Sequence, residues 1–177
     1  RMQGKVALVS GGAEGIGAAV ARLIVAEGGS VMLGDVQLKK AQGLAAELGE
    51  RAAATSLDVR DLAQWEAAVA ATQARFGKLT VLCNIAGISE PGNVPDGAID
   101  VWHRTIDINL HGPFYGMRAA IPAMEASGEP CAIVNIGSMI ALRPASFVAA
   151  YSASKTGLRG LTPVSYTHLT LPTNREV

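Results

Sequence analysis

Two residues near the end of the chain, Tyr151 and Lys155, have the types and the spacing for acid–base chemistry. A separation of four residues places both side chains on one face of a helix. An ammonium group beside a phenol favours the phenolate form, so Tyr151 is a candidate general acid and base near neutral pH. Ser138, at the end of an apolar run, could hold a substrate oxygen by a hydrogen bond.

A glycine-rich turn near the start of the chain could bind phosphate groups. The stretch SGGAEGIG, residues 10–17, follows an apolar run and precedes a helical pattern. Glycines allow a tight turn there, and backbone N–H groups at the start of a helix attract the pyrophosphate of a dinucleotide. No Lys-Ser/Thr pair follows, so the turn is not a nucleoside triphosphate loop. The spacing is G-x-x-x-G-x-G, and the candidate cofactor-binding residues are Gly11, Gly15, Ile16 and Gly17.

Asp35 ends the second apolar run, about twenty residues after the turn. A carboxylate at that position can accept hydrogen bonds from the adenosine ribose hydroxyls, whereas it repels the 2′-phosphate of NADP. Glu14 adds to this repulsion, and no Arg or Lys in the turn or directly after Asp35 offsets it. The sequence therefore predicts NAD as the cofactor, although an aspartate here could also cap a helix.

Two further strand ends carry candidate cofactor-binding residues. Asp58 and Val59 end the third apolar run, and Asn84, Ala86 and Gly87 end the fourth. Because the carboxyl ends of parallel strands meet at one edge of a sheet, these residues would line the adenine side of the same crevice. Each is also an ordinary turn residue by type, so they support the prediction only together.

These residues need a scaffold in which strand ends converge, and the rest of the chain has the corresponding pattern. Fully apolar runs alternate with amphipathic stretches, which favours a parallel sheet covered by helices on both faces. Right-handed crossovers then give a single α/β domain with a Rossmann-type doubly wound parallel sheet. The predicted strands are 5–10, 30–35, 52–59, 78–87 and 131–138. Helices are predicted after the first strand, over 37–49, around 65–76, in two stretches within 99–127, and from about residue 149.

The composition excludes several classes of function. Lys+Arg and Asp+Glu are balanced at 15 each, so no basic surplus points to nucleic acid or to an anionic membrane. No apolar run has the length of a membrane span. Cys83 and Cys131 lie in apolar segments typical of reduced core cysteines, which favours a cytoplasmic protein. His103, His111 and His168 lack the spacing of metal ligands, so no metal site is predicted.

Together these residues resemble the short-chain dehydrogenase/reductase family. The resemblance runs from about residue 4 to residue 162, with the motifs in the family's order and spacing. Its elements are the glycine turn, Asp35, Asp58-Val59, NIAG at 84–87, Asn109, Ser138, Tyr151 and Lys155. The chain departs from the family at Ile85, where a second asparagine is usual, and we expect only local repacking there.

The resemblance implies a role for each catalytic candidate. Tyr151 would be the general acid and base, and both Tyr151 and Lys155 would bind the cofactor, Lys155 at the nicotinamide ribose. Ser138 would position the carbonyl or hydroxyl group of the substrate, and Asn109 would hold a water that connects Lys155 to solvent. The implied reaction is reversible hydride transfer between NAD(H) and a secondary alcohol or ketone, carried out by a homodimer or homotetramer.

The segment MIALRPASFVAA, residues 139–150, is apolar and would form the near wall of the substrate pocket. It favours a bulky alicyclic or steroid-like alcohol, and GMRAAIPAM at 116–124 is similar to the same segment in hydroxysteroid and cyclic-alcohol members. Two other functions stay open: a non-catalytic NAD-binding regulatory protein, and an epimerase or dehydratase that uses NAD without net redox change. Accumulation of reduced nicotinamide with an alcohol would separate the dehydrogenase from both.

The final stretch, PVSYTHLTLPTNREV at 163–177, has neither the apolar period of a helix nor that of a strand. Residues 164–173 can be back-translated into a transposase sequencing adapter read in frame, so we expect a non-native tail after a partial NAD-binding domain over 1–162. Pro163 is expected to end the helix of Tyr151. The family's sixth and seventh strands would be missing, which would leave the fifth as an apolar sheet edge. We therefore expect the 177-residue chain itself to be inactive.

Overall fold

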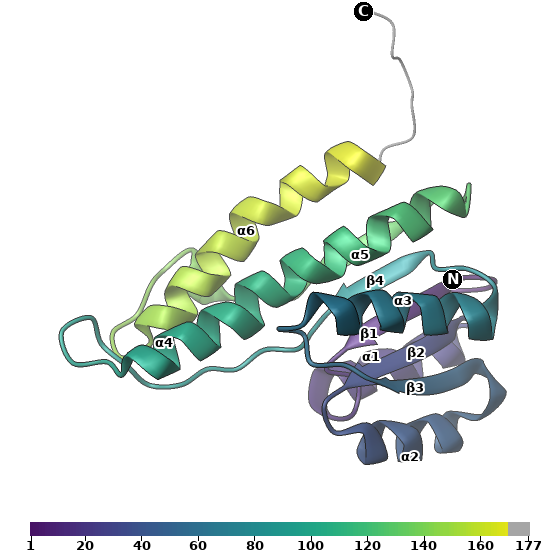
Figure 1. Cartoon of the computed structure of the whole chain (residues 1–177), viewed down its shortest axis with the longest axis horizontal. Coiled ribbons are helices and arrows are strands. Elements are labelled where there is room, and N and C mark those ends of the chain that lie inside the picture. Colours follow the sequence, from purple (N-terminus) through teal and green to yellow (C-terminus); the bar gives the residue numbers. More distant parts are fainter. Residues whose placement is uncertain (170–177) are drawn as a thin grey trace, which may run out of the picture.

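Five parallel strands form one sheet in the order β3-β2-β1-β4-β5 (Figure 1). The computed structural model describes the backbone of residues 1–169 and the side chains of residues 1–164. The strands are β1 (Val6–Ser10), β2 (Ser30–Asp35), β3 (Ala52–Ser56), β4 (Val81–Asn84) and β5 (Ala132–Asn135). The chain order reverses between β1 and β4, which is the switch point of a doubly wound sheet, so the predicted Rossmann-type fold is confirmed.

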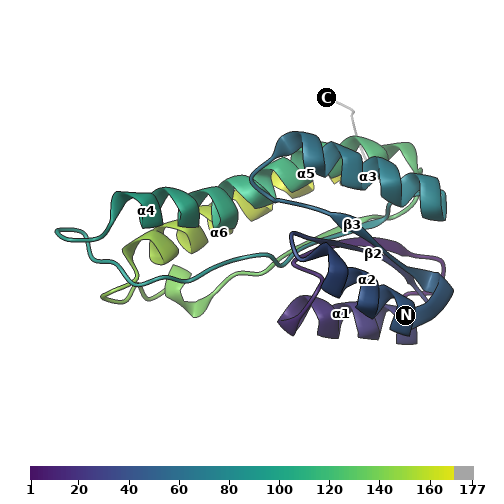
Figure 2. The ribbon, with the colours of Figure 1, turned by 60° about the horizontal axis from the view of Figure 1, so that its bottom comes forward.

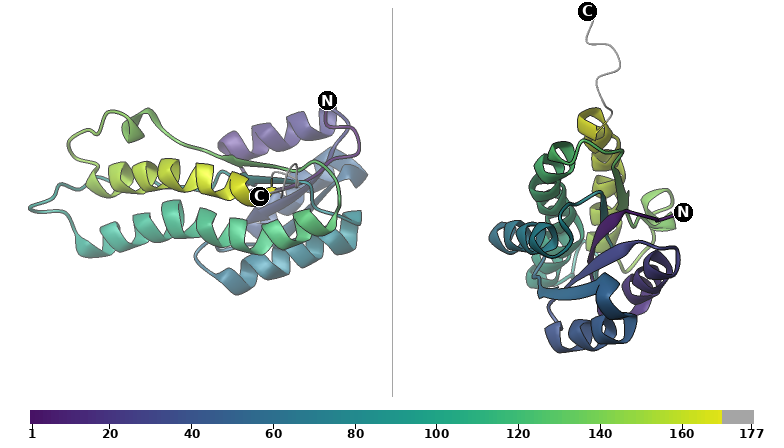
Figure 3. Two further views of the ribbon diagram at one scale, coloured as in Figure 1. Left: turned by 90° about the horizontal axis from the view of Figure 1, so that it is seen from above. Right: turned by 90° about the vertical axis from the view of Figure 1, so that its right-hand side faces the viewer.

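Helices cover both faces of the sheet. On one face lie α1 (Gly15–Ala26) and α2 (Leu38–Leu48), and on the other lie α3 (Leu62–Phe76), α5 (Gly112–Ala126) and α6 (Ala149–Leu169) (Figure 2). Beyond the sheet, α4 (Ile99–Ile106) packs beside α6 (Figure 3). The shorter helical segments are η1 (Gly49–Arg51), η2 (Asp107–His111) and η3 (Met139–Ala141).

Side chains along β1 alternate between two apolar cores, one on each face of the sheet. Ala7 and Val9 belong to the cluster that contains Ile24 of α1. Leu8 belongs to the other cluster, together with Trp65 of α3. Because helices cover both faces, all five residues of β1 are buried, which explains why this strand is apolar throughout. Burial of each large apolar side chain contributes about 1.5–3 kcal/mol and fixes the strand end from which the glycine turn departs.

Residues 99–126 form one continuous helical rod, in which α4 and α5 are the two stretches predicted within 99–127. The π-helical segment η2 joins α4 to α5 without a break (Figure 3). Gly112 N–H donates to the Asp107 carbonyl, which is the wider hydrogen-bond spacing of a π turn. Pro113, which has no N–H, comes directly after this turn. The proline therefore falls where the hydrogen-bond ladder is already altered, and the rod continues.

α6 continues through Pro163 to Leu169, so the prediction that this proline ends the helix is wrong. A proline inside a helix removes one hydrogen bond and crowds a carbonyl of the preceding turn, at a cost of about 3 kcal/mol. Leu158 is buried and Leu161 packs against the apolar core, so the turns before the proline stay docked on the sheet. Of the predicted tail over 163–177, residues 170–177 lie outside the described residues, and its non-native origin stays a prediction.

The described part of the chain lacks several features. No sixth or seventh strand occurs within residues 1–169, and β5 pairs with β4 alone, with Val134 46% exposed. The prediction of an apolar edge at β5 is therefore confirmed for these residues. None of their helices is long and apolar enough to cross a membrane. The same residues contain no group of three or more side chains that could hold a metal ion.

Cys83 provides a chemical test of the buried position of β4. Burial raises the pKa of its thiol to about 11, because a thiolate is poorly solvated in the apolar core. At about pH 8 we expect Cys83 to react with iodoacetamide roughly 100-fold more slowly than a thiol with an ordinary pKa. Cys131 is only partly buried and serves as the internal control in peptide mapping after a timed pulse. Equal labelling of both cysteines in the folded chain would contradict this position.

Candidate active site

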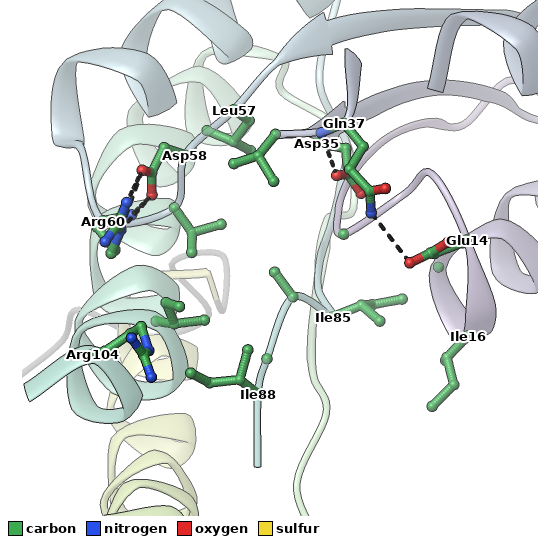
Figure 4. Close-up of a pocket in the computed structure, with 17 residues that line it drawn as sticks. Glu14, Ile16, Asp35, Gln37, Leu57, Asp58, Arg60, Ile85, Ile88 and Arg104 are labelled. Atoms are coloured by element: carbon green, nitrogen blue, oxygen red, sulfur yellow. Dashed lines mark hydrogen bonds and ion pairs between the residues drawn. The ribbon is translucent and has the colours of Figure 1, made fainter. Parts of the chain in front are cut away.

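A crevice of about 580 Å³ opens where the carboxyl ends of β1, β2, β3 and β4 meet (Figure 4). The sequence-predicted cofactor residues that line it are Gly11, Ile16, Gly17, Asp35, Asp58, Val59, Ala86 and Gly87. These residues are far apart in the chain and come together because the strands are parallel and adjacent. Doubly wound sheets bind their ligands at this edge, so the crevice is the candidate cofactor site.

The glycine turn before α1 has no room for side chains at two of its positions. A Cβ atom on Gly17 would lie 1.9 Å from the Gly11 carbonyl oxygen, and one on Gly11 would lie 2.9 Å from the backbone of Ala86. Gly11 and Gly15 have φ angles of 69° and 57°, which favour glycine. Glu14, the N-cap residue of α1, makes no capping hydrogen bond with its side chain. The first amides of α1 are thus not capped by Glu14, and the residues present fit a pyrophosphate.

Asp35 ties the glycine turn to the end of β2. Its Oδ2 accepts a hydrogen bond from the Ala13 N–H at 3.0 Å, and its Oδ1 accepts one from the Gln37 N–H at 2.9 Å. Each carboxylate oxygen keeps a second lone pair, so a ribose hydroxyl could still donate to Asp35. On the same wall, Glu14 pairs with Lys40 at 2.9 Å, and this hydrogen bond is the main reason why the pKa of Glu14 is lowered. The wall is therefore acidic (Figure 4).

Two arginines lie on the opposite wall of the crevice (Figure 4). The Nε of Arg60 donates to both carboxylate oxygens of Asp58, at 2.9 and 3.1 Å, and this pairing holds the pKa of Asp58 below its ordinary value. The Nε of Arg104 donates to Glu90 at 3.0 Å. Each arginine is thus neutralised by a carboxylate, so this wall has little net charge.

Tyr151 and Lys155 share one face of α6, as their spacing predicts. The Nζ of Lys155 lies 5.7 Å from the centre of the Tyr151 ring and donates a hydrogen bond to the Ile136 carbonyl at 2.7 Å. Lys155 is only 5% exposed, and this burial lowers the pKa of its ammonium group. A Cβ atom added to Gly87 would lie 3.7 Å from this Nζ. The ammonium group therefore stands beside the residue that lines the end of the crevice.

Asn109 is buried in η2 and holds the segment that follows Gly87. Its Oδ1 accepts from the Ile88 N–H at 2.9 Å, and its Nδ2 donates to the Ile88 carbonyl at 2.8 Å. The same Nδ2 donates to the Ser154 Oγ at 3.2 Å, next to Lys155 in α6. Asn109 therefore joins the end of β4 to the helix of Tyr151, and its role in holding a water stays a prediction.

Ser138 follows β5 and caps η3. Its Oγ accepts a hydrogen bond from the Ile140 N–H at 3.2 Å. A hydroxyl that accepts one hydrogen bond still carries its own hydrogen, which Ser138 could donate to a substrate oxygen. The segment between Ser138 and Tyr151 carries three strongly exposed apolar side chains, Met139 (71%), Leu142 (55%) and Phe147 (67%).

Four predicted cofactor residues are not among the residues that line the crevice: Gly15, Asn84, Tyr151 and Lys155. A Cβ atom on Gly15 would meet no other atom within 4 Å. Asn84 is buried between strands, where its Nδ2 donates to the Oδ1 of Asn135 at 2.8 Å. The Nδ2 of Asn135 in turn donates to the Thr162 Oγ1 of α6 at 3.1 Å. Asn84 thus belongs to a network that joins β4, β5 and α6. Its contact with a cofactor stays a prediction, as do those of Gly15, Tyr151 and Lys155.

Sequence reasoning missed Arg60, Arg104 and Asn135. Arg60 directly follows the predicted pair Asp58-Val59, so its position gave a local signal. Arg104 and Asn135 gave none, because their partners lie 14 and 51 residues away in the chain. Ile85, the departure from the family motif, lines the crevice and its N–H donates to the Ser10 Oγ at 3.1 Å.

The comparisons with known proteins agree with this geometry. A family model described as short chain dehydrogenase matches residues 5–170. The chain is 44% identical over 162 residues to a 3-alpha-(or 20-beta)-hydroxysteroid dehydrogenase of Mycobacterium tuberculosis, covering 92% of this chain and 62% of the relative. It is 42% identical over 174 residues to a trans-4-hydroxycyclohexanecarboxylate dehydrogenase of Sinomonas cyclohexanicum, covering 93% and 66%. It is 37% identical over 158 residues to a galactitol 2-dehydrogenase of Agrobacterium fabrum, covering 89% and 62%.

The matched region contains the whole crevice, Asn109, Ser138 and the helix with Tyr151 and Lys155. The chain spans 62% of the length of the mycobacterial relative, so the comparison concerns this part of the fold. Within it, the sheet order, the glycine turn and the Tyr–Lys helix occur together in one domain. From the family match and this arrangement, the chain belongs to the short-chain dehydrogenase family.

Proposed function

We propose that the whole protein is an NAD(H)-dependent oxidoreductase that interconverts a secondary alcohol and a ketone. One observation carries the proposal: the buried Lys155 ammonium lies 5.7 Å from the Tyr151 ring and beside Gly87 at the end of the crevice. A positive charge in that position would attract the negative charge that develops on the phenol oxygen during proton transfer, and it would lie near a ribose bound in the crevice. The names of the three relatives, all dehydrogenases of hydroxylated compounds, point the same way.

Each catalytic candidate would have its own part in the transfer of the proton. The nicotinamide cofactor, when bound, supplies the acceptor for the hydride that leaves the alcohol carbon. The Tyr151 phenolate takes the proton of the alcohol hydroxyl, so the C–H and O–H bonds break and a C=O double bond forms. Ser138 donates a hydrogen bond to the substrate oxygen in both directions of the reaction. The Lys155 ammonium would attract the negative charge on the Tyr151 oxygen. Asn109 keeps α6 in place through its hydrogen bond to Ser154.

The cofactor that we propose is NAD, and Asp35 is the residue that would select it. We expect Asp35→Asn to lower the ratio of the NADP to the NAD dissociation constant at least about tenfold, because the charge that repels a 2′-phosphate is removed. Isothermal titration of both cofactors measures this ratio. Glu47→Gln is the matched control, since Glu47 is exposed in α2, is paired with Arg22 and does not line the crevice. An unchanged ratio in Asp35→Asn would contradict the assignment of Asp35.

The substrate that we propose is a bulky alicyclic or steroid-like alcohol. Met139, Leu142 and Phe147 expose apolar surface on the segment that joins Ser138 to Tyr151. An apolar wall beside the reacting groups suits a ring system better than a polyol. The hydroxysteroid and hydroxycyclohexanecarboxylate relatives support this class, whereas the galactitol relative has the lower identity.

We also propose a cytoplasmic homodimer or homotetramer. Ile99 and Trp102 in α4 and Phe114 in α5 are exposed along the rod that packs beside α6 (Figure 3). Large apolar side chains that remain exposed on packed helices are typical of subunit contacts. The two reduced cysteines suit a reducing compartment.

An assay with a panel of alcohols tests the proposed function. The protein encoded by the complete source gene is incubated with NAD and cyclic secondary alcohols, with linear polyols as the comparison. We expect reduced nicotinamide to accumulate fastest with the cyclic alcohols. Binding of NAD without accumulation on any alcohol would favour the regulatory protein, and conversion of substrate without accumulation would favour the epimerase or dehydratase. The same assay on the 177-residue chain tests whether residues 1–177 suffice.

A further inference from the structure

Residues 88–98, in the segment that joins β4 to α4, are fixed at several points, and we call them the brace loop. At its start, Ile88 makes two hydrogen bonds with the side chain of Asn109, at 2.9 and 2.8 Å. Two residues later, Glu90 accepts a hydrogen bond from Arg104 of α4 at 3.0 Å. Asn109, a candidate site residue, and Arg104, which lines the crevice, therefore hold the start of the brace loop.

The middle of the brace loop is attached to the residues just before α6. The N–H of Gly92 donates to the Phe147 carbonyl at 2.7 Å, and the N–H of Ala149 donates to the Gly92 carbonyl at 2.9 Å. These two bonds form a parallel bridge between Gly92 and Val148. A side chain completes the attachment, because the Oδ1 of Asn93 accepts a hydrogen bond from the Phe147 N–H at 3.0 Å.

Phe147 is held in an unfavourable backbone conformation by these contacts. Its φ is 66°, and no other residue except glycine has a positive φ within residues 1–169. A bulky side chain in the left-handed region is strained and persists only where the surroundings enforce it. The Phe147 side chain is 67% exposed, so packing of the ring does not stabilise this backbone conformation. The Phe147 carbonyl accepts a hydrogen bond from the Gly92 N–H, and the Phe147 N–H donates one to Asn93 Oδ1, so both backbone groups of Phe147 are held in this conformation.

The start of α6 depends on the same contacts. Ala149 is the first residue of α6, and its N–H is one of the amides that have no partner within the helix. The Gly92 carbonyl satisfies it, and Tyr151 follows two residues later in the same first turn. Any change in the direction of the chain at Phe147 would therefore shift the point at which this turn begins, and with it the phenol.

We propose that Asn93 is a positioning residue, which holds Phe147 in its strained conformation and through it sets the first turn of α6 and the place of Tyr151. The kinetic part of this inference rests on the proposed function. The contact uses only a side-chain oxygen as acceptor, so aspartate retains it and alanine removes it. Asp96, exposed in the same brace loop, offers a matched control position.

Hydrogen–deuterium exchange on the 177-residue chain tests whether Asn93 holds Phe147 in place, and it needs no enzymatic turnover. We expect Asn93→Ala to speed exchange of the Phe147 and Ala149 amides about tenfold, because a local opening loses one closing hydrogen bond. Asn93→Asp is expected to retain most of the protection, and Asp96→Ala to leave it unaltered. Unchanged exchange in Asn93→Ala, or equal loss in Asn93→Asp and Asn93→Ala, would overturn the proposal.

Kinetics of the protein from the complete gene test the consequence for catalysis. We expect Asn93→Ala to lower kcat on a cyclic alcohol roughly tenfold through misplacement of the phenol, with little change in the affinity for NAD. Asn93→Asp should recover most of the rate. Faster exchange in Asn93→Ala without any change in kcat would overturn the positioning role. A wild-type protein that turns over no alcohol would instead refute the proposed function, and the exchange result would still decide whether Asn93 holds the turn.

Discussion

Replacing Tyr151 with phenylalanine is expected to lower kcat on a cyclic secondary alcohol by about 10²–10⁴-fold, the range ascribed to a general acid–base group. The ring stays in place beside Lys155, but the oxygen that would exchange the proton is lost. Affinity for NAD should change little, because the residues that line the crevice are untouched. Initial rates and a calorimetric titration with NAD on the protein from the complete gene measure both quantities.

The control for this substitution is Tyr115→Phe. Tyr115 lies in α5, packs against the apolar core and contacts the ring of Phe114, so it is not part of the crevice. We expect Tyr115→Phe to keep the rate of the unmodified protein. A Tyr151→Phe variant that retains more than about a tenth of kcat would contradict the role of Tyr151, since proton transfer by a positioned group is worth more than that.

Replacing Gly17 with alanine is expected to damage both stability and cofactor binding. The added Cβ would lie 1.9 Å from the Gly11 carbonyl oxygen and 2.8 Å from its carbon, and backbone atoms cannot rotate out of the way as a side chain would. The turn must therefore open, at a cost of about 1–3 kcal/mol in the free energy of unfolding. An opened turn no longer presents the first amides of α1 to a pyrophosphate, so we expect NAD affinity to fall at least about tenfold.

Gly43→Ala is the matched control for this loss. Gly43 lies exposed in α2, and a Cβ atom there would meet nothing within 4 Å. The same chemical change should therefore stabilise the chain by about 0.5–1 kcal/mol, because alanine favours helix more than glycine does. Urea unfolding of both variants measures the difference. Equal stabilities of Gly17→Ala and Gly43→Ala would contradict the described geometry of the turn.

The sheet could be predicted from sequence because its strands are buried on both faces and read as continuous apolar runs. Strand ends were less predictable. The run over 78–87 yields only Val81–Asn84, and residues 85–87 line the crevice instead of continuing the strand. The continuity of the rod through η2 and of α6 through Pro163 could not be predicted. Local propensity opposes a helix at both prolines, and only packing against the sheet and the π turn overrides it.

Some residues of the candidate site could likewise be predicted from the sequence, and others could not. The glycines and the Tyr–Lys pair have short spacings that reflect one turn and one helix face, and Asp35 is marked by its place at the end of the second apolar run. Asn93, Arg104 and Asn135 act through partners on other elements, and no local pattern marks them. The brace loop is the clearest case. Its contact with Phe147 joins residues 54 positions apart in the chain, and only the folded structure brings them together.

Transfer of an isotope label tests the central proposal most directly. A cyclic secondary alcohol with deuterium on its carbinol carbon is incubated with NAD and the protein from the complete gene, and the cofactor is analysed by mass spectrometry. We predict that the reduced nicotinamide carries the deuterium, because the hydride passes directly from that carbon while Tyr151 takes the hydroxyl proton. Reduced cofactor without the label, or an alcohol that stays unoxidised while NAD is bound, would contradict the proposed function.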